Sequence, residues 1–477
     1  MGKITRFVFQ SCLVLFFLVA SCDRANAQYQ ATVSSQPQQT IKGWGVFPAW
    51  PDWPAGEDIL KSPAIQKALY KELGITLIRV RIFHGSYNNA LDNGSLDTSF
   101  LDRTLVKHLQ IAKKNGIAQY FTSTWSPPVP MKKCNTWKGK CPDGSANSLK
   151  PEREDDYIRY NVKVLKYLKS KGLGLPVAFS IQNEPDAAVD WDGCVYSKEQ
   201  FQRVVKKMRA AFDANGLKSV KIHGPEGATL DGSWERLGGV GLPDLYNDAE
   251  LNQAIGFITH HTYHQWSWGT KDVNVMKQYS NAAARTGKDL WMTEWAAPVG
   301  STQIDKTLNE MRHLARDLVI IKNNYWVWWM GWWLGSGSYN AEQTLLYGNP
   351  SNPTKTQRFD IYKRLWNSVR PGYVVKHLTT NDPDLKANND INIDMVAFDG
   401  AKSMVVLFNN HTWTNKKITV KRLAGTNLRK YQTTSTENMA DKGSTKIVRG
   451  SAIVSLPAKS VVLIVTNAGN GGSSLPR

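Results

Sequence analysis

Residues 176–186 read Pro-Val-Ala-Phe-Ser-Ile-Gln-Asn-Glu-Pro-Asp, and this stretch decides the predicted fold. Its apolar residues largely follow one another instead of alternating strictly with polar ones. Such a run is typical of a strand that is buried on both faces, as in a parallel sheet. Pro185 lacks a backbone N–H, so the strand is expected to end there and to leave Asn183 and Glu184 at its carboxyl end.

Seven further runs of this kind occur along the chain, and helix-like segments that end in Gly or Asn-Gly separate them. The runs are 41–47, 76–82, 118–125, 220–223, 256–261, 289–293 and 325–330. Eight strands that alternate with helices predict an α/β fold, a (β/α)8 TIM barrel, over residues 41–370.

The pattern changes at Arg370-Pro371-Gly372. From 371 to 467, short strands alternate with turns and no long helix is expected, which predicts a β-sandwich. The segment 28–40 is also strand-like, and we expect it to join the sandwich, so that this side domain is built from both chain ends. Residues 468–477 are rich in Gly and Ser and are expected to form a flexible tail.

The N-terminus is typical of an export signal. Lys3 and Arg6 precede an apolar run at 7–20 that is too short for a transmembrane helix. Ala25-Asn26-Ala27 predicts a signal peptide of residues 1–27. A competing site, Val19-Ala20-Ser21-Cys22, resembles a bacterial lipobox and would remove residues 1–21 and lipidate Cys22. Both alternatives predict an exported bacterial protein, secreted, periplasmic or held at the outer surface by a lipid that would be its only membrane contact.

The composition points to partners outside the cell. The chain has 18 tryptophans and a formal net charge of +19. Tryptophan offers a flat apolar platform for sugars, although a large aromatic core is the alternative. A basic surface favours anionic partners, and for an exported protein we expect an acidic polysaccharide rather than nucleic acid; ordinary solubility is the other explanation. We expect a monomer.

Two glutamates stand where chemistry is expected. In a TIM barrel the active residues lie at the carboxyl ends of the strands. Glu184 ends the fourth run, and Lys288-Asp-Leu-Trp-Met-Thr-Glu294 places Glu294 at the end of the seventh. These strands lie across the barrel mouth from each other. Two carboxyl groups that face one another over a cleft are the minimum for glycoside hydrolysis. The alternatives are a surface turn for Glu184 and a buried ion pair for Glu294.

Polar residues at other strand ends would support this pair. Arg79 in the second run is expected to keep Glu294 ionised, with a structural salt bridge as the alternative, and Tyr263 would donate a hydrogen bond to it. Asn183 would bind a sugar hydroxyl. Glu226 ends the fifth run and is expected to form hydrogen bonds near the pair.

Tryptophans at the strand ends predict a floor for the reacting sugar. Trp125 ends the third run, and Trp328 and Trp329 lie in the eighth. Because neighbours on a strand point to opposite faces, only one of the last two should face the cleft. Core filling is the alternative for all three.

The cysteines and histidines predict no metal site. Cys134 and Cys141 bracket a short loop and could close it as a disulfide, which export permits and which would leave Cys194 free. His260, His261 and His264 lie close together in the sequence but lack the HExxH spacing. We therefore expect no metal site.

The motifs together resemble glycoside hydrolase family 30, with the bacterial xylanase branch, subfamily 8, as the nearest match. The matching stretches are Lys42-Gly-Trp-Gly45, the Arg79 run, Thr124-Trp-Ser-Pro-Pro128, Ser180–Asp186, His261-Thr-Tyr263, Gly287–Glu294, Tyr325-Trp-Val-Trp-Trp329 and Val369-Arg-Pro-Gly-Tyr373. The resemblance implies a retaining mechanism with Glu184 as acid/base and Glu294 as nucleophile, and it implies no cofactor. It also brings Trp44 into the set of expected substrate-binding residues.

One stretch departs from that branch. Its glucuronoxylan-specific members carry arginines soon after the tryptophans of the eighth strand, whereas this chain reads Met330-Gly-Trp-Trp-Leu334. Trp332 and Trp333 are therefore expected to bind substrate in place of cations, and a strict need for glucuronate is in doubt.

The function predicted from all this is a retaining endo-β-glycanase that acts on xylan or glucuronoxylan. An endo-β-1,6-galactanase, an endo-β-1,6-glucanase and an exo-acting β-glycosidase stay open as alternatives. A polysaccharide-binding lipoprotein without activity is a further one.

Overall fold

The structure is a computed structural model that describes residues 29–82, 96–263, 270–296, 302–334, 343–385 and 394–467. Cys22 and the expected signal segment, His264 and the tail 468–477 lie outside these residues. Among the described helices, none combines the length and the apolar character needed to cross a membrane.

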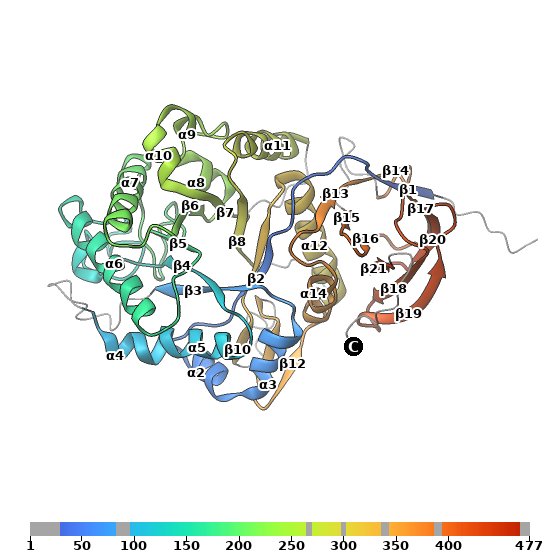
Figure 1. The fold of residues 1–477 in the computed structure, drawn as a ribbon, viewed down its shortest axis with the longest axis horizontal. Coiled ribbons are helices and arrows are strands. Elements are labelled where there is room, and N and C mark those ends of the chain that lie inside the picture. The colour runs from blue at the N-terminus through green and yellow to red at the C-terminus, as the bar shows by residue number, and fades with distance from the viewer. Residues whose placement is uncertain are drawn as a thin grey trace, which may run out of the picture.

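The larger part of the chain is a closed barrel of eight parallel strands ringed by helices, so the predicted TIM barrel is confirmed (Figure 1). The strands are β2 (Gly43–Phe47), β3 (Leu77–Ile82), β4 (Gln119–Thr124), β5 (Ala178–Ser180), β6 (Lys221–Gly227), β7 (Ile255–His261), β8 (Leu290–Trp295) and β9 (Tyr325–Trp329).

The helices of the outer layer begin where the sequence supplies caps. Ser197 accepts a hydrogen bond from the N–H of Gln200 at the start of α7, and Thr302 does the same for Asp305 at the start of α12. The described helices are α2 (Pro54–Lys61), α3 (Pro63–Gln66), α4 (Thr98–Leu101), α5 (Lys107–Lys114), α6 (Glu154–Ser170), α7 (Lys198–Ala214), α8 (Leu230–Glu235), α9 (Pro243–Asn247), α10 (Ala249–Ala254), α11 (Thr270–Arg285), α12 (Gln303–Arg316) and α14 (Gln357–Ser368).

The interior of the barrel is built in layers, and β3 shows them in order. Leu77, Arg79 and Arg81 point inward from alternate positions, about 6.6 Å apart along the strand. Leu77 belongs to an apolar plug that also contains Phe121 and Trp291. The plug closes the lower end of the barrel, so the polar residues above it face the carboxyl ends of the strands.

The remaining strands form two sheets beside the barrel, to the right in Figure 1. One has the order β14-β1-β17-β20, with β1 (Tyr29–Val33), β14 (Leu378–Thr380), β17 (Lys416–Lys421) and β20 (Ser451–Leu456). The other has the order β13-β15-β16-β21-β18-β19, with β13 (Val374–Lys376), β15 (Met395–Asp399), β16 (Met404–Asn410), β18 (Asn427–Thr433), β19 (Ala440–Lys446) and β21 (Ser460–Thr466). Because β1 pairs with both β14 and β17, the two chain ends meet in one sheet.

Trp44 corrects one expectation from the sequence. Its side chain is fully buried on the outside of the barrel, where it stacks on Trp366 at 5.9 Å and meets Phe398 edge-on. The indole N–H donates to the carbonyl of Val369 at 2.6 Å. Trp44 therefore joins the barrel to the sandwich and does not bind substrate. The prediction was wrong because alternation along β2 turns this residue away from the barrel interior.

A small third sheet lies in the connection after β9. It consists of β10 (Trp332–Leu334), β11 (Leu346–Asn349) and β12 (Asn352–Lys355). Trp332 is fully buried there, and its indole N–H donates to Asp58 at 3.2 Å. The expectation that Trp332 binds substrate is therefore wrong as well. Its neighbour Trp333 points the other way and stays partly exposed.

Candidate active site

The backbone around Glu184 is held from both sides. The N–H of Asn183 donates to the carbonyl of Thr124 on β4 at 2.7 Å, and the N–H of Glu184 donates to that of Glu226 on β6 at 3.0 Å. Glu184 adopts a φ of 51°, which is sparsely populated for residues other than glycine and persists where the surroundings impose it. These contacts present the carboxyl group, 13% exposed, at the barrel mouth.

Glu294 lies deeper in the same mouth. A register irregularity between Met292 and Trp295 interrupts the alternation of β8, so Trp295 packs outward against His313 while Glu294 points inward. The Arg79 guanidinium binds one carboxylate oxygen of Glu294, and the hydroxyl of Tyr263 donates to the other at 3.0 Å. One oxygen of Glu294 and one of Glu184 lie within 4.8 Å of each other.

Arg79 contacts several other residues of the site. It is fully buried and donates to Glu294, to the amide oxygen of Asn183 at 2.6 Å and to Glu226 at 2.9 Å. Ser123 donates to the same oxygen of Glu226 at 2.9 Å. Glu226 is thus placed beneath the Glu184–Glu294 pair as an ion-pair partner of Arg79. Asn183 has its amide oxygen engaged by Arg79.

Burial and charge act in opposite directions on these groups. Burial raises the pKa of Glu294, and the neighbouring Glu184 adds to this, while His261 and Arg79 oppose it. At Glu226 burial is also the largest effect and acts to raise the pKa, but Arg79, His223, His261 and the hydrogen bond from Ser123 together outweigh it, so the pKa is lowered. Burial and the carboxylate of Glu294 raise the pKa of Tyr263 far above its ordinary value, so its hydroxyl stays a hydrogen-bond donor.

His261 is a site residue whose role the sequence did not predict. Its Nδ1 lies 3.1 Å from a carboxylate oxygen of Glu184, and its ring is fully buried. Burial lowers the pKa of His261, which favours the neutral ring. The signal in the sequence was its place at the end of β7, two positions before Tyr263. His260 points outward instead and contacts Tyr279 at 3.1 Å.

The group of Glu184, His261 and Glu294 also offers three ligand atoms within 4.8 Å of one another. Oxygen and imidazole ligands at this spacing suit a divalent cation. However, the guanidinium of Arg79 already binds Glu294, and a second cation beside it would be repelled. The arrangement therefore fits a proton-transfer site better than a metal centre.

An aromatic floor lies beside the carboxylates. The Arg79 guanidinium rests 4.4 Å from the ring centroid of Trp125, which stacks on Trp329 at 5.9 Å. Phe47 stacks on Trp329 at 4.3 Å, and Trp50 closes the cluster. Trp125 and Trp329 are therefore brought to the site from β4 and β9.

Trp328 lies on the opposite face of β9 from Trp329. It is fully buried against Trp295, Trp326 and Tyr362, and its N–H donates to the carbonyl of Gln343. Trp328 is therefore a core residue, which corrects its assignment to the substrate-binding set. The structure follows the expected alternation, since one member of the pair faces the cleft.

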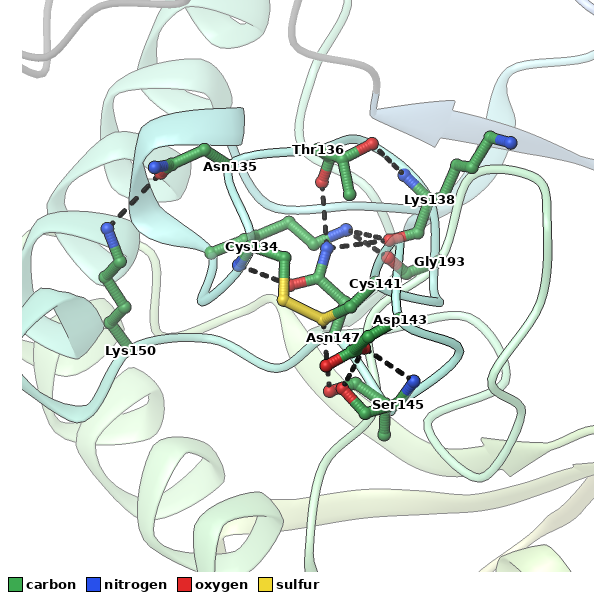
Figure 2. Close-up of a disulfide and its surroundings, with 12 residues drawn as sticks. Cys134, Asn135, Thr136, Lys138, Cys141, Asp143, Ser145, Asn147, Lys150 and Gly193 are labelled. Carbon is green, nitrogen blue, oxygen red and sulfur yellow. Dashed lines mark hydrogen bonds between the residues drawn. A yellow bond between two sulfur atoms is a disulfide. The ribbon is translucent and has the colours of Figure 1, made fainter.

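The connection between β4 and α6 forms one wall of the mouth, and a disulfide joins Cys134 and Cys141 within it (Figure 2). Asn147 fastens this loop by accepting from the N–H of Cys134 and donating to the carbonyls of Thr136 and Lys138. Cys194 is buried with a free thiol. The disulfide and its hydrogen bonds make this wall a structured element.

Comparisons with known proteins find relatives in sequence and in fold. The chain is 25% identical to the glucuronoxylanase XynC of Bacillus subtilis (strain 168) over 451 residues. This alignment covers 91% of this chain and 90% of that protein. A solved family 30 subfamily 8 xylanase from Clostridium acetobutylicum has a TM-score of 0.70 and 24% identity, over 92% of this chain and 100% of that one. A solved endo-β-1,6-glucanase has a TM-score of 0.64 and 17% identity, over 92% and 94%.

No protein-family model matches the chain. The resemblance to glycoside hydrolase family 30 that the motifs predicted is nevertheless confirmed by these relatives, because both the sequence match and the fold extend over about nine tenths of the chain.

Proposed function

We propose that this chain, a glycoside hydrolase that resembles family 30, is a retaining endo-β-glycanase whose acid/base is Glu184 and whose nucleophile is Glu294. The observation that carries the proposal is the spacing of the two carboxylates, whose nearest oxygens lie within 4.8 Å. Retaining glycosidases hold their carboxyl groups about 5–5.5 Å apart, whereas inverting ones leave about 6.5–9.5 Å for a water.

The reaction would proceed in two displacements. Glu184 donates its proton to the glycosidic oxygen as that bond breaks, while a carboxylate oxygen of Glu294 bonds to the anomeric carbon. Glu184, now a carboxylate, takes a proton from water, whose oxygen attacks the same carbon and releases Glu294. Each displacement inverts the carbon, so the product keeps the configuration of the substrate.

The neighbours prepare each carboxyl group for its task. Arg79 and Tyr263 bind both oxygens of Glu294, which orients it and stabilises its charge against the cost of burial. His261 is placed to exchange a hydrogen bond with Glu184 and to hold its carboxyl group toward the cleft. Trp329, which is 8% exposed, offers an apolar edge to the sugar at the point of cleavage, and Trp125, which is 2% exposed, stacks on Trp329 and supports it.

We propose xylan as the substrate. The curated relative is a glucuronoxylanase, which supports a xylan backbone. The stretch Met330-Gly-Trp-Trp-Leu334 offers no cation for a glucuronate, which supports cleavage without that side group. A solved endo-β-1,6-glucanase shares the fold, so β-1,6-linked glucan is the second candidate.

The test is product analysis with matched variants. Purified protein is incubated with linear xylan, glucuronoxylan, β-1,6-glucan and arabinogalactan, and the anomer first released is followed by proton NMR. We expect β-configured xylo-oligosaccharides of mixed length, and loss of turnover in both Glu184→Gln and Glu294→Gln. Glu250→Gln, which removes an exposed carboxylate that pairs with Lys206 on the outer helices, is the matched control. Release of the α-anomer would exclude retention.

The location of the protein is proposed from its N-terminal sequence. We propose that the chain is exported as a monomer, by way of a signal peptide or with a lipid on Cys22. Mass spectrometry of the mature N-terminus distinguishes the two, since free secretion leaves Gln28 first and lipidation leaves a diacylated Cys22. Intact Met1 in the mature protein would contradict both.

A further inference from the structure

Two tryptophans at the barrel mouth are exposed without an evident structural reason. Trp53, in the connection between β2 and α2, is 47% exposed, and Trp191, in the connection between β5 and α7, is 58% exposed. Both connections leave the carboxyl ends of barrel strands, the end that carries Glu184 and Glu294. Exposing an indole to water is costly, so a pair at one face suggests a binding surface.

One guanidinium holds both residues in place. Arg81 lies one inward layer above Arg79, and it binds Asp52 at 2.6 Å and Asp192 at 2.7 Å. Asp52 directly precedes Trp53, and Asp192 directly follows Trp191. The Arg81 guanidinium also lies 4.1 Å from the ring centroid of Trp50 in the aromatic floor. The ion pairs of Arg81 therefore fix the backbone next to both exposed tryptophans, directly above the layer of Arg79 and the two glutamates.

Each tryptophan also has a firm support of its own. The ring of Trp53 lies 5.6 Å from that of Trp333, which comes from the connection after β9. The carbonyl of Trp191 accepts from the N–H of Gly139 at 3.0 Å, within the wall closed by the Cys134–Cys141 disulfide. A platform that is already ordered loses little conformational entropy when a ligand stacks on it.

The charge around this mouth favours a neutral ligand. The chain carries a net charge of +19, yet the sequence between strands and helices at the carboxyl ends of six barrel strands contains neither Lys nor Arg: 48–53, 83–97, 181–197, 228–229, 262–269 and 296–302. In the connection after β9 the one such residue is Lys355, which pairs with Glu72 at 2.7 Å.

The connection after β4 is the exception, since residues 125–153 contain five lysines and one arginine. Lys132 among them is buried, and Lys140 pairs with Asp190 at 3.2 Å. The eight connections together hold seven basic and ten acidic residues, so the mouth lacks the basic excess of the chain as a whole.

We propose that Trp53 and Trp191 are outer sugar-binding platforms that stack on neutral pyranose units of the polysaccharide, beyond the sugars next to the scissile bond. The proposal rests on the proposed function of the carboxylate pair and adds the substrate class, a long neutral chain. It replaces the expectation of an acidic polysaccharide drawn from the net charge.

The test separates long from short substrates. Trp53→Ala and Trp191→Ala are compared with wild type on linear xylan and on an aryl xylobioside, whose two sugars and leaving group end close to the scissile bond. Each change should lower kcat/KM on linear xylan about tenfold, chiefly through KM, because an indole platform is lost. Turnover of the aryl xylobioside should stay within about twofold.

A matched control is available on the sandwich. Trp413 is 81% exposed and lies under Lys459, so Trp413→Ala removes an exposed indole far from the mouth and should change neither substrate. Unchanged kcat/KM on linear xylan in both platform variants would overturn the proposal. An equal loss on the short substrate would overturn it too, since it would place the effect at the point of cleavage.

Binding is measured separately from cleavage in the Glu294→Gln background, by retardation in gels that contain linear xylan or glucuronoxylan. We expect retardation by both polymers, to a similar extent, and its loss on adding Trp53→Ala and Trp191→Ala. Preference for glucuronoxylan by more than about tenfold would refute the neutral-chain assignment. A wild-type protein that is retarded in the gel but cleaves no panel substrate would count against the proposed function alone.

Discussion

At the scale of the residue, the site depends on one buried arginine, Arg79, that forms ion pairs with two glutamates. Arg79 binds Glu294 and Glu226 at once, so two carboxylates compete for one positive charge. Removing a buried partner from such a network costs more than the pair contributes, since the remaining charge is left uncompensated. Conservative changes around Arg79 are therefore more informative than its removal.

The hydroxyl of Tyr263 is expected to support the charge of Glu294 directly. In Tyr263→Phe the ring stays but the hydrogen bond at 3.0 Å is lost, so kcat/KM should fall by about 10- to 100-fold, the equivalent of about 1.5–3 kcal/mol for a bond to a charged group. Steady-state kinetics on xylan measure this. Tyr373→Phe removes a comparable hydroxyl contact, to Ser403 in the sandwich, and should leave the rate unchanged. Equal rates in wild type and Tyr263→Phe would contradict the role.

The pH dependence of activity should respond to Glu226. Activity on the acid side is lost as pH falls through the pKa of Glu294, because the nucleophile must be ionised. Glu226→Gln removes a negative charge and leaves Arg79 freer to stabilise Glu294, so the pKa of Glu294 falls and the acid limb should move to lower pH by about one unit or less.

The measurement for Glu226→Gln is the profile of kcat/KM from about pH 4 to 8. Glu250→Gln again serves as the control, because it removes an exposed carboxylate that pairs with Lys206, and its profile should match that of wild type. An acid limb that stays in place or moves to higher pH in Glu226→Gln would disprove this coupling.

At the scale of the element, the wall after β4 depends on a buried lysine. Lys132 donates to Ser126 at 2.9 Å, to the carbonyls of Trp137 and Lys138 at 2.9 and 2.8 Å, and to that of Gly193 in the neighbouring connection. It thus joins two loops that bear on the mouth, one of which carries Trp191. Burial lowers the pKa of Lys132 to about 8.

Lys132→Met should loosen this wall. The change removes the donor to the carbonyl of Gly193, whereas the carbonyls of Lys138 and Trp137 still accept from Asn147 and from the N–H of Gly193. This is expected to cost about 1–3 kcal/mol in the free energy of unfolding. Denaturant unfolding followed by tryptophan fluorescence gives the value. Lys133→Met alters the exposed neighbour and should stay within about 0.5 kcal/mol of wild type. A Lys132→Met variant with the stability of wild type and an unaltered KM on xylan would show that the loop between β4 and α6 does not depend on the hydrogen bonds of Lys132.

At the scale of the whole molecule, barrel and sandwich share a core. The main apolar cluster runs from the barrel helices into the six-stranded sheet and includes Trp44, Trp366, Phe398 and Leu463. A second cluster fills the space between the two sheets of the sandwich. Because β1 enters the sandwich before the chain begins the barrel, the two parts are linked at both ends of the chain. We expect them to unfold together.

Trp44→Ala tests this union. Loss of the buried indole should lower the free energy of unfolding by about 3–5 kcal/mol, with barrel and sandwich still unfolding in one transition. KM on xylan should not change, since Trp44 lies outside the site. Trp413→Ala, at an exposed position, should stay within about 0.5 kcal/mol of wild type. A raised KM without loss of stability would restore the substrate-binding assignment.

Much of the fold could be predicted from the sequence because its signals are local. Unbroken apolar runs and the Gly or Asn-Gly endings of the helices are each set by neighbouring residues, and they placed Glu184 and Glu294 at strand ends. The positions of Arg79 and Tyr263 followed from the same periodicity. Whether a short segment forms a strand or a turn depends mainly on its own residues and their backbone geometry, so it can be predicted without the rest of the chain.

The tertiary structure alone decided which tryptophans face the cleft and which charges meet. All five of Trp44, Trp125, Trp328, Trp329 and Trp332 are buried, and only the closure of the barrel and the docking of the sandwich place Trp125 and Trp329 beside Arg79 and the other three away from it. Likewise, Arg81 meets Asp52 and Asp192 across a sequence separation of up to 111 residues. Such contacts depend on three-dimensional packing between distant segments, and no local pattern in the sequence records that packing.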